Sequence, residues 1–153
     1  MWTIKKLAMT DAEGYKNLLK DYELANAAGF VAIDNAIMLD MLFVSTLKND
    51  ITYLILLNQQ TIGSISFSLS LDFTGYEVGY MLKQQYRHQG IMRQAFPRAL
   101  EAFKQLRPMA TLFAKVHEKN SYSKRILSNS SFMLYKQQII NQQVIEIYQK
   151  ELQ

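Results

Sequence analysis

The chain has 153 residues, a formal net charge of +4 and no cysteine. Apolar residues make up 49% and charged residues 20%, which is typical of a globular domain and excludes a disordered chain. The length suits a single domain covering residues 1–153. The missing cysteines exclude disulfides, thiolate metal sites and a cysteine nucleophile, and they fit a cytoplasmic location.

Charge is distributed unevenly along the sequence. Residues 1–76 carry a net charge of −3 and residues 77–153 carry +7. All five arginines lie between Lys83 and Arg125, where ten basic residues accompany only two glutamates. This asymmetry predicts a polyanionic partner, which is nucleic acid, an anionic lipid or a phosphorylated cofactor. A solvated basic surface is the alternative.

No segment has the pattern of a membrane helix or a secretion signal. The most apolar span, residues 24–47, carries Asp34 and Asp40 in its interior. The apolar stretch after Lys6 is only three residues long. We therefore expect a soluble protein without a membrane partner.

The chain is expected to begin with a strand and two helices. Residues 2–7 form the strand, and Thr10 and Glu13 form a capping box that begins a helix over 15–25. A second helix is expected after Asp34. Its apolar side would consist of Ile37, Met38, Met41, Leu42 and Leu47.

Three strands follow, because the sequence changes from helical to alternating periodicity. They are expected over residues 51–57, 64–71 and 76–83, with turns at 58–60 and 72–75. In the second strand a serine alternates with an apolar residue, which predicts one polar and one buried face. The buried face would hold Ile65, Phe67, Leu69 and Leu71.

Helical periodicity returns after Gly90. One apolar stripe continues from Met92 to Leu106, with Pro97 on the outer face of the helix. The remaining elements are a strand over 111–116, a helix over 120–130, and a hairpin of strands over 132–138 and 144–150. This order predicts a mixed α/β fold, with a sheet flanked by helices.

The segment most informative about function is YEVGYMLKQQYRHQGIMR, residues 76–93, which predicts a strand, a tight turn and a long helix. The first amides of a helix have no intrahelical partner, and the helix dipole favours an anion there. Gly90 lets a phosphate approach the backbone without meeting a Cβ atom, and Arg87 and Arg93 flank the opening. The segment is therefore interpreted as an anion-binding loop. Because Gly90 stands alone and no Gly-Lys-Ser/Thr follows, it is neither a dinucleotide fingerprint nor a Walker loop.

This loop strongly resembles the acyl-CoA pyrophosphate loop of the GNAT superfamily of N-acyltransferases. The family pattern is Arg/Gln-x-x-Gly-x-Gly/Ala after a strand that often ends in Glu-Val/Ile-Gly-Tyr. It appears here as RHQGIM, residues 87–92, after EVGY, residues 77–80. Met92 departs from the small residue at the last position, which is tolerable if its side chain turns into the core.

A second block of sequence agrees with this resemblance. Asn120 and Ser123 are similar to the family's Asn-x-x-Ser helix, which usually leads into Gly-Phe, and Ser131 replaces that glycine before Phe132. The resemblance covers nearly the whole chain, most closely the branch that acetylates ribosomal-protein N-termini. It implies a central mixed, mostly antiparallel sheet of six to seven strands with about four helices. The fourth and fifth strands would splay apart to admit pantetheine.

The resemblance implies acetyl-CoA as co-substrate, whose phosphates would account for the basic second half. The end of the fourth strand would pair with the pantetheine amides, and Asn120 would bind the pantetheine arm. Ser123 would lie near the thioester sulfur, and Lys124 would meet outer phosphates or remain solvated. The implied cofactor-binding residues are Met81, Leu82, Lys83, Arg87, His88, Gln89, Gly90, Ile91, Met92, Asn120, Ser123 and Lys124. No metal site is expected, since the two histidines lack suitably spaced partners.

Acetyl transfer in this family is a direct attack of a neutral amine on the thioester, so a base must remove a proton from the incoming ammonium. Glu77 is the expected base, since strand alternation directs it away from Val78; a surface glutamate is the alternative. The family often uses a tyrosine to protonate the leaving thiolate. That position is Leu127 here, so Ser123, Tyr122 or solvent would take the role.

We therefore expect an acetyl-CoA-dependent N-acetyltransferase whose acceptor is a protein N-terminus or a small amine. The alternative is a catalytically idle CoA- or nucleic-acid-binding module. Nucleic acid is disfavoured because the aromatic residues do not interleave with the basic ones. The Met-rich stretch 38–43 is expected in the core or as a hydrophobic wall for the acceptor. The closing hairpin offers an edge through which a homodimer could pair.

Overall fold

The computed structural model describes all 153 residues, and its seven strands form one sheet in the order β1-β2-β3-β4-β5-β7-β6. Neighbouring strands are antiparallel except β4 and β5, which are parallel. The strands are β1 (Trp2–Lys6), β2 (Ile51–Leu57), β3 (Gln60–Leu69), β4 (Tyr76–Leu82), β5 (Thr111–His117), β6 (Met133–Ile140) and β7 (Gln143–Glu151). The helices are α1 (Ala12–Lys20), α2 (Tyr22–Ala28), α3 (Ala36–Asn49), α4 (Ile91–Leu106) and α5 (Ser121–Asn129), with short 3-10 turns at Met9–Asp11 and Gln84–Tyr86. The mixed, mostly antiparallel sheet flanked by helices confirms the expected fold class.

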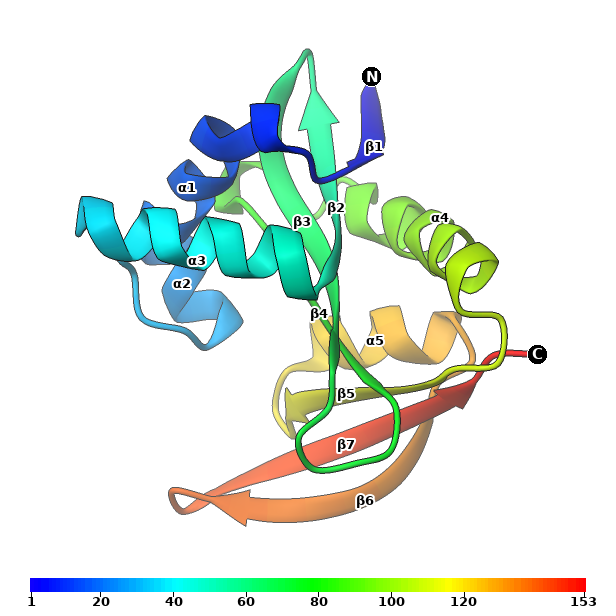
Figure 1. Cartoon of the computed structure of the whole chain (residues 1–153). Coiled ribbons are helices and arrows are strands. Elements are labelled where there is room, and N and C mark those ends of the chain that lie inside the picture. Colours follow the sequence, from blue (N-terminus) through cyan, green and yellow to red (C-terminus); the bar gives the residue numbers. More distant parts are fainter.

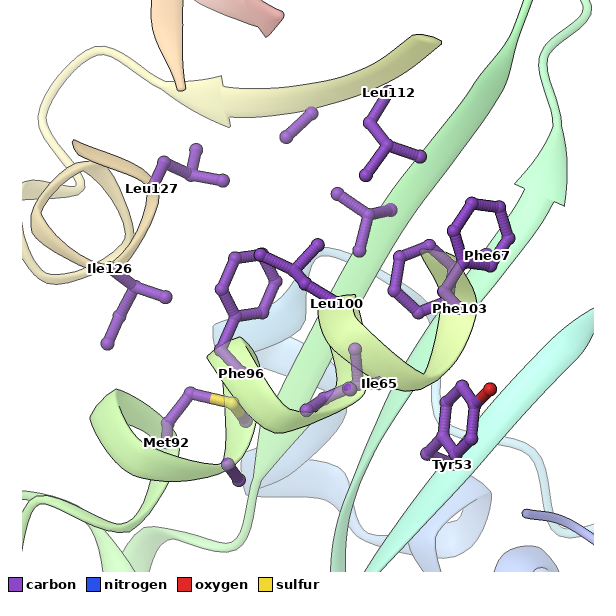
Figure 2. Close-up of a cluster of buried hydrophobic side chains, with 14 of the residues drawn as sticks. Tyr53, Ile65, Phe67, Met92, Phe96, Leu100, Phe103, Leu112, Ile126 and Leu127 are labelled. Carbon is purple, nitrogen blue, oxygen red and sulfur yellow. The ribbon is translucent and has the colours of Figure 1, made fainter. Parts of the chain in front are cut away.

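The helices lie on the two faces of the sheet, as Figure 1 shows. Helices α1, α2 and α3 contact one side of β1–β4, and α4 and α5 lie on the other side. The larger hydrophobic core lies between the sheet and α4 (Figure 2). There Phe67 of β3 stacks on Phe103 of α4 at a centroid distance of 4.1 Å. The apolar stripe predicted for this helix is buried except for Leu106, and Pro97 lies on its exposed side.

The expected first helix is broken in two at Asp21. This residue has extended backbone angles, and its carboxylate accepts the amide of Leu24, so it caps the start of α2. The predicted capping box of Thr10 and Glu13 is wrong. Instead, the carboxylate of Asp11 accepts the amide of Ala8 at 2.8 Å.

Two predicted apolar faces are wrong in part. In α3 the buried residues are Leu39 and Phe43, so the expected apolar side is largely exposed. In β3, Ile65 and Phe67 are buried as predicted, but Leu69 is exposed, because the strand ends there and the chain turns away from the core. Leu71 follows in the loop and is also exposed.

The parallel pairing of β4 and β5 is short. Only Tyr76 with Leu112 and Glu77 with Phe113 are paired, after which the two strands diverge. Figure 1 shows β5, β7 and β6 turning away from β2, β3 and β4. The expected splay of the fourth and fifth strands is therefore present, and it opens a wedge in the sheet. None of the helices is both long enough and apolar enough to span a bilayer.

Candidate functional site

The predicted anion-binding loop lies at the start of α4, as expected. Gly90 caps this 16-residue helix with a left-handed φ of 77°. A Cβ atom built on Gly90 would meet no heavy atom within 4 Å, so the space in front of the first turn is open. The first amides of α4 have no intrahelical acceptor, and the dipole makes this end positive. An anion can therefore approach these amides directly.

Arg87 has a structural role that its place in the sequence did not indicate. Its Nε atom donates to the backbone oxygen of Leu82 at 2.9 Å, which ties the loop to the end of β4. The guanidinium also favours ionisation of the nearby Tyr122 phenol, although burial is the larger effect and raises the pKa of Tyr122 above its usual value. The ring of Tyr122 packs edge-on to His88 at 6.1 Å.

The wedge between β4 and β5 is bridged by one hydrogen bond. The Tyr80 hydroxyl donates to the backbone oxygen of Ser123, at the start of α5, at 3.0 Å. Burial raises the pKa of Tyr80 far above its ordinary value, so this phenol stays protonated and remains a donor at neutral pH. Its ring packs against Phe96 of α4.

A cavity of about 230 Å³ lies between these elements. It is lined by Ala27, Ala28, Tyr80, Met81, Leu82, Arg87, His88, Met92, Asn120, Tyr122 and Ser123. Two separate segments of the sequence, residues 76–93 and the segment that holds Asn120 and Ser123, thus meet around one space. Ala27, Ala28 and Tyr80 were missed as lining residues. The alternation in EVGY placed Tyr80 on a strand face, but nothing local indicated that α2 would reach the cavity.

Lys83, Gln89 and Ile91 were also predicted to bind the cofactor, but they do not line this cavity. Lys83 follows β4, and its amide donates to the backbone oxygen of Ile62. The side chain of Gln89 donates to the backbone oxygen of Gln85. Ile91 is buried in the core, so only its backbone amide can face the loop. Met92 lines the cavity, but most of its side chain turns into the core, as its place in the motif requires.

Asn120 and Lys124 are held by contacts within the protein. The Asn120 side-chain oxygen accepts the amide of Ser123 at 3.0 Å and caps α5, which leaves its amide nitrogen available to the cavity. The Lys124 ammonium donates to the backbone oxygen of Glu118 at 2.8 Å and lies 3.2 Å from the Glu146 carboxylate. The charge of Lys124 is therefore largely neutralised.

A second cavity, of about 600 Å³, lies between the end of α2 and the β6–β7 turn. It shares Ala27, Ala28, Tyr80, Asn120 and Ser123 with the first cavity, so the two spaces adjoin at the wedge. Its other lining residues are Asn26, Gly29, Val78, Gly79, Ala114, Lys115, Val116, His117, Ile140, Asn141, Gln143 and Ile145. This lining includes no carboxylate.

Glu77 lines neither cavity. Its carboxylate accepts the Ser70 hydroxyl at 2.7 Å and lies 3.5 Å from the Lys115 ammonium, which also pairs with Asp72. Lys115 does line the second cavity. Gly79, the next residue on the same face of β4, lines it as well and has open space where a side chain would be. Glu77 therefore lies beside the second cavity, beyond Lys115 and Gly79.

The sequence matches one known protein family. The model of the Acetyltransferase (GNAT) domain family matches residues 3–133. No curated protein sequence matches the chain significantly.

Solved structures share the fold at low sequence identity. Spermidine N-acetyltransferase from Vibrio cholerae, in complex with CoA and spermine, superposes with a TM-score of 0.82 at 14% identity, covering 99% of this chain and 95% of that one. A proposed acetyltransferase from Salmonella typhimurium, solved with its cofactor acetyl-CoA, has a TM-score of 0.79 at 16% identity. The match covers 99% of this chain and 94% of that one. Ribosomal-protein-S5-alanine acetyltransferase from Vibrio fischeri has a TM-score of 0.75 at 16% identity, and the match covers 99% of this chain and 93% of that one. Since the family model spans most of the sequence, the chain belongs to the GNAT acetyltransferase domain family.

Proposed function

We propose that this protein transfers an acetyl group from acetyl-CoA to a primary amine by direct attack within a ternary complex. The observation that carries the proposal is the junction of two cavities at Tyr80 and Ser123, in the wedge between β4 and β5. The first cavity lies beside the open start of α4, and the second has a mixed polar and apolar lining. Two substrates entering from the two sides would meet at the wedge.

Acetyl-CoA would occupy the first cavity. Its pyrophosphate would bind the open amides in front of Gly90 at the start of α4. Its pantetheine arm would run along Met81–Lys83, where β4 no longer pairs with β5 and its backbone groups on that edge are free. The Asn120 amide nitrogen would contact this arm. The thioester would then lie near Tyr80 and Ser123.

The amine acceptor would occupy the second cavity. Its lining has one charged residue, Lys115, and no carboxylate. A polyamine carries several positive charges and would need carboxylates to replace its water. The lining of the second cavity therefore favours an acceptor with one reactive amine. We propose that the acceptor is a protein N-terminus and not a polyamine. Because one structural neighbour is a spermidine N-acetyltransferase, a small amine is the alternative acceptor and is included in the test.

Proton transfer would use groups on both sides of the wedge. We propose that Glu77 receives the proton of the ammonium through water, because Gly79 leaves open space beside it. Direct contact would be blocked by the interactions of Glu77 with Ser70 and Lys115. The leaving thiolate would be protonated by Tyr122 or Ser123, both of which line the first cavity.

The proposal is tested by measuring release of the CoA thiol with acetyl-CoA and a panel of acceptors. The panel holds peptides with a free N-terminus, the same peptides N-acetylated, spermidine and a single-amine small molecule. We expect release with free peptides and none with blocked ones. No release with any acceptor, combined with tight binding of CoA or RNA, would support the idle binding module instead. Faster turnover of spermidine than of any peptide would overturn the choice of acceptor.

A further inference from the structure

Helix α3 presents an apolar face to solvent. Its residues Leu39 and Phe43 are buried, whereas Met41 lies on the opposite side of the helix and is 66% exposed. Figure 1 shows α3 on the outside of its layer, beside α1 and α2. The exposed apolar side chains of this helix, which we call the α3 face, are Ile37, Met38, Met41, Leu42 and Val44. Contiguous apolar surface of this kind marks an interaction site.

The charges at the two ends of the α3 face have opposite signs and are placed symmetrically. Asp34 precedes Met41 by seven positions, and Lys48 follows it by seven. Lys48 lies two helical turns, or roughly 10 Å along the axis, from Met41, and Asp34 lies just before the helix, two residues ahead of Ala36. Both residues are exposed. Asp40, the acidic residue within the helix, is already paired with Lys16 of α1.

Such a face is complementary to a second copy of itself when the two helices pack antiparallel. With Met41 on the two-fold axis, Asp34 of each copy faces Lys48 of the other, and Met38 faces Val44 of the other. Parallel packing would instead place equal charges against each other. An antiparallel contact is isologous, so it closes a dimer and leaves no free copy of the face.

A groove beside the α3 face fits this arrangement. It has a volume of about 570 Å³ and lies between α3 and the preceding segment, with Asp34 at its border. Its apolar walls include Leu19, Phe30, Ile33, Met38 and Leu42. In the antiparallel pair, the second half of the other copy's helix lies over this groove. We propose that the α3 face is the contact surface of a homodimer, with Met41 at its two-fold axis.

The oligomeric state tests this interface. Sedimentation equilibrium of the full chain at low salt should show a monomer–dimer equilibrium. Met41→Glu places two carboxylates against each other at the axis, so the dimer should dissociate at least about tenfold more readily. Asp34→Lys and Lys48→Asp should each weaken it, and the double variant should restore it by exchanging the charges. Because these residues are exposed, circular dichroism should show unchanged folding.

Cross-linking gives a second, independent measurement. The chain has no cysteine, so Met41→Cys carries a single thiol, and at the axis two such thiols should form one disulfide under mild oxidation. Ile139→Cys, which is also exposed but lies on the β6 edge, is the control and should form no intermolecular disulfide. A wild-type chain that is monomeric up to its solubility limit would overturn the proposal. So would cross-linking through Ile139 but not Met41, or charge exchange that fails to restore a dimer broken by both single variants.

Discussion

The hydroxyl of Tyr80 donates to the backbone oxygen of Ser123 across 3.0 Å, and this bond joins β4 to α5 over the wedge in the sheet. It lies where β4 and β5 have stopped pairing, so no ladder hydrogen bond supports the sheet at this point. It also lies where the two cavities adjoin. The bond therefore holds the width of the wedge while leaving space on both sides of it.

Replacing Tyr80 by phenylalanine should lower the free energy of unfolding by about 0.5–1.5 kcal/mol at pH 7, because one hydrogen bond is lost. The effect should change with pH. The folded chain raises the pKa of Tyr80, so between pH 10 and that raised value the folded state holds a proton that the unfolded state has lost. This contribution to stability is complete below pH 10 and declines as the pH rises.

Urea unfolding from pH 8 to 11 checks this prediction. The free energy of wild-type unfolding should fall more steeply above pH 10 than that of Tyr80→Phe, by up to about 1.4 kcal/mol per pH unit. Tyr148, whose pKa is raised to about 12 by burial and by Glu146, adds the same slope to both proteins. Tyr22→Phe, at an exposed position, is the control. Equal slopes for wild type and Tyr80→Phe would show that Tyr80 is not held protonated by the fold.

Local features of the sequence were predictable, because they depend on neighbouring residues. The strand-like apolar run 51–57 and the stripe after Gly90 predicted β2 and α4 nearly to the residue. The turn expected between the last two strands contains Asn141 and Gln142, and both adopt positive φ. The position of Gly90 at the start of α4 follows from the change of period at that residue.

Contacts between distant segments could not be predicted in this way. Tyr80 and Ser123 are separated by 43 positions, and neither has a local pattern that indicates the other. The surroundings of Glu77 depend on Ser70 in the preceding loop and on Lys115 in β5. The exposed side of α3 was also mispredicted, because apolar spacing alone does not say which side of a hydrophobic helix faces the protein.

Gly90→Val should abolish tight CoA binding while the chain still folds. The new side chain would project into the open space where an anion must approach, and φ of 77° is unfavourable for a β-branched residue. Affinity measured by calorimetry should fall about a hundredfold or more, since each hydrogen bond to a charged group contributes about 1.5–3 kcal/mol. Asn58→Val, at φ of 50° in the β2–β3 turn, carries comparable strain away from the loop. Asn58→Val should bind CoA with wild-type affinity. If Gly90→Val also bound CoA with wild-type affinity, the anion site would lie elsewhere.

Arg87 should contribute to CoA binding through both its charge and its bond to Leu82. Arg87→Gln removes both and should cost about 1–3 kcal/mol of binding free energy, with a weaker dependence on salt. Arg87→Lys keeps the charge but loses the Nε donor, so it should retain the salt dependence and still bind more weakly than wild type. Arg107→Gln, at the far end of α4, is the control. Wild-type affinity for Arg87→Lys would mean that the bond to Leu82 does not position the loop.

Glu146 should stabilise the fold above mildly acidic pH. The Tyr148 hydroxyl, at 2.8 Å, and the Lys124 ammonium lower the pKa of Glu146 from its ordinary 4.5. The stability this supplies is present above pH 4.5 and is lost as the pH falls through the lowered value. Glu146→Gln should therefore cost about 1–3 kcal/mol at pH 7, and the difference from wild type should shrink below pH 4.5. Glu23→Gln on α2 is the control; a Glu146→Gln deficit that is constant from pH 7 to 3 would contradict the assignment.

The remaining prediction concerns Glu77 as the base in the proposed reaction. Glu77→Gln keeps the shape of the side chain and a contact for Ser70, while Lys115 stays paired with Asp72. Turnover should fall by about 10²–10⁴, the range for loss of a general base. CoA affinity should be unchanged, because the anion-binding loop lies beyond the other end of β4.

Ser70→Ala separates loss of the base from loss of its surroundings. It removes the hydroxyl that donates to Glu77 at 2.7 Å but leaves the carboxylate, so its turnover should stay much closer to wild type than that of Glu77→Gln. Product release can mask a slow chemical step, so both variants are compared in single turnovers with acetyl-CoA already bound. If Glu77→Gln then matches the wild-type single-turnover rate, Glu77 takes no part in proton transfer. The space beside Gly79 would in that case deliver the proton to solvent alone.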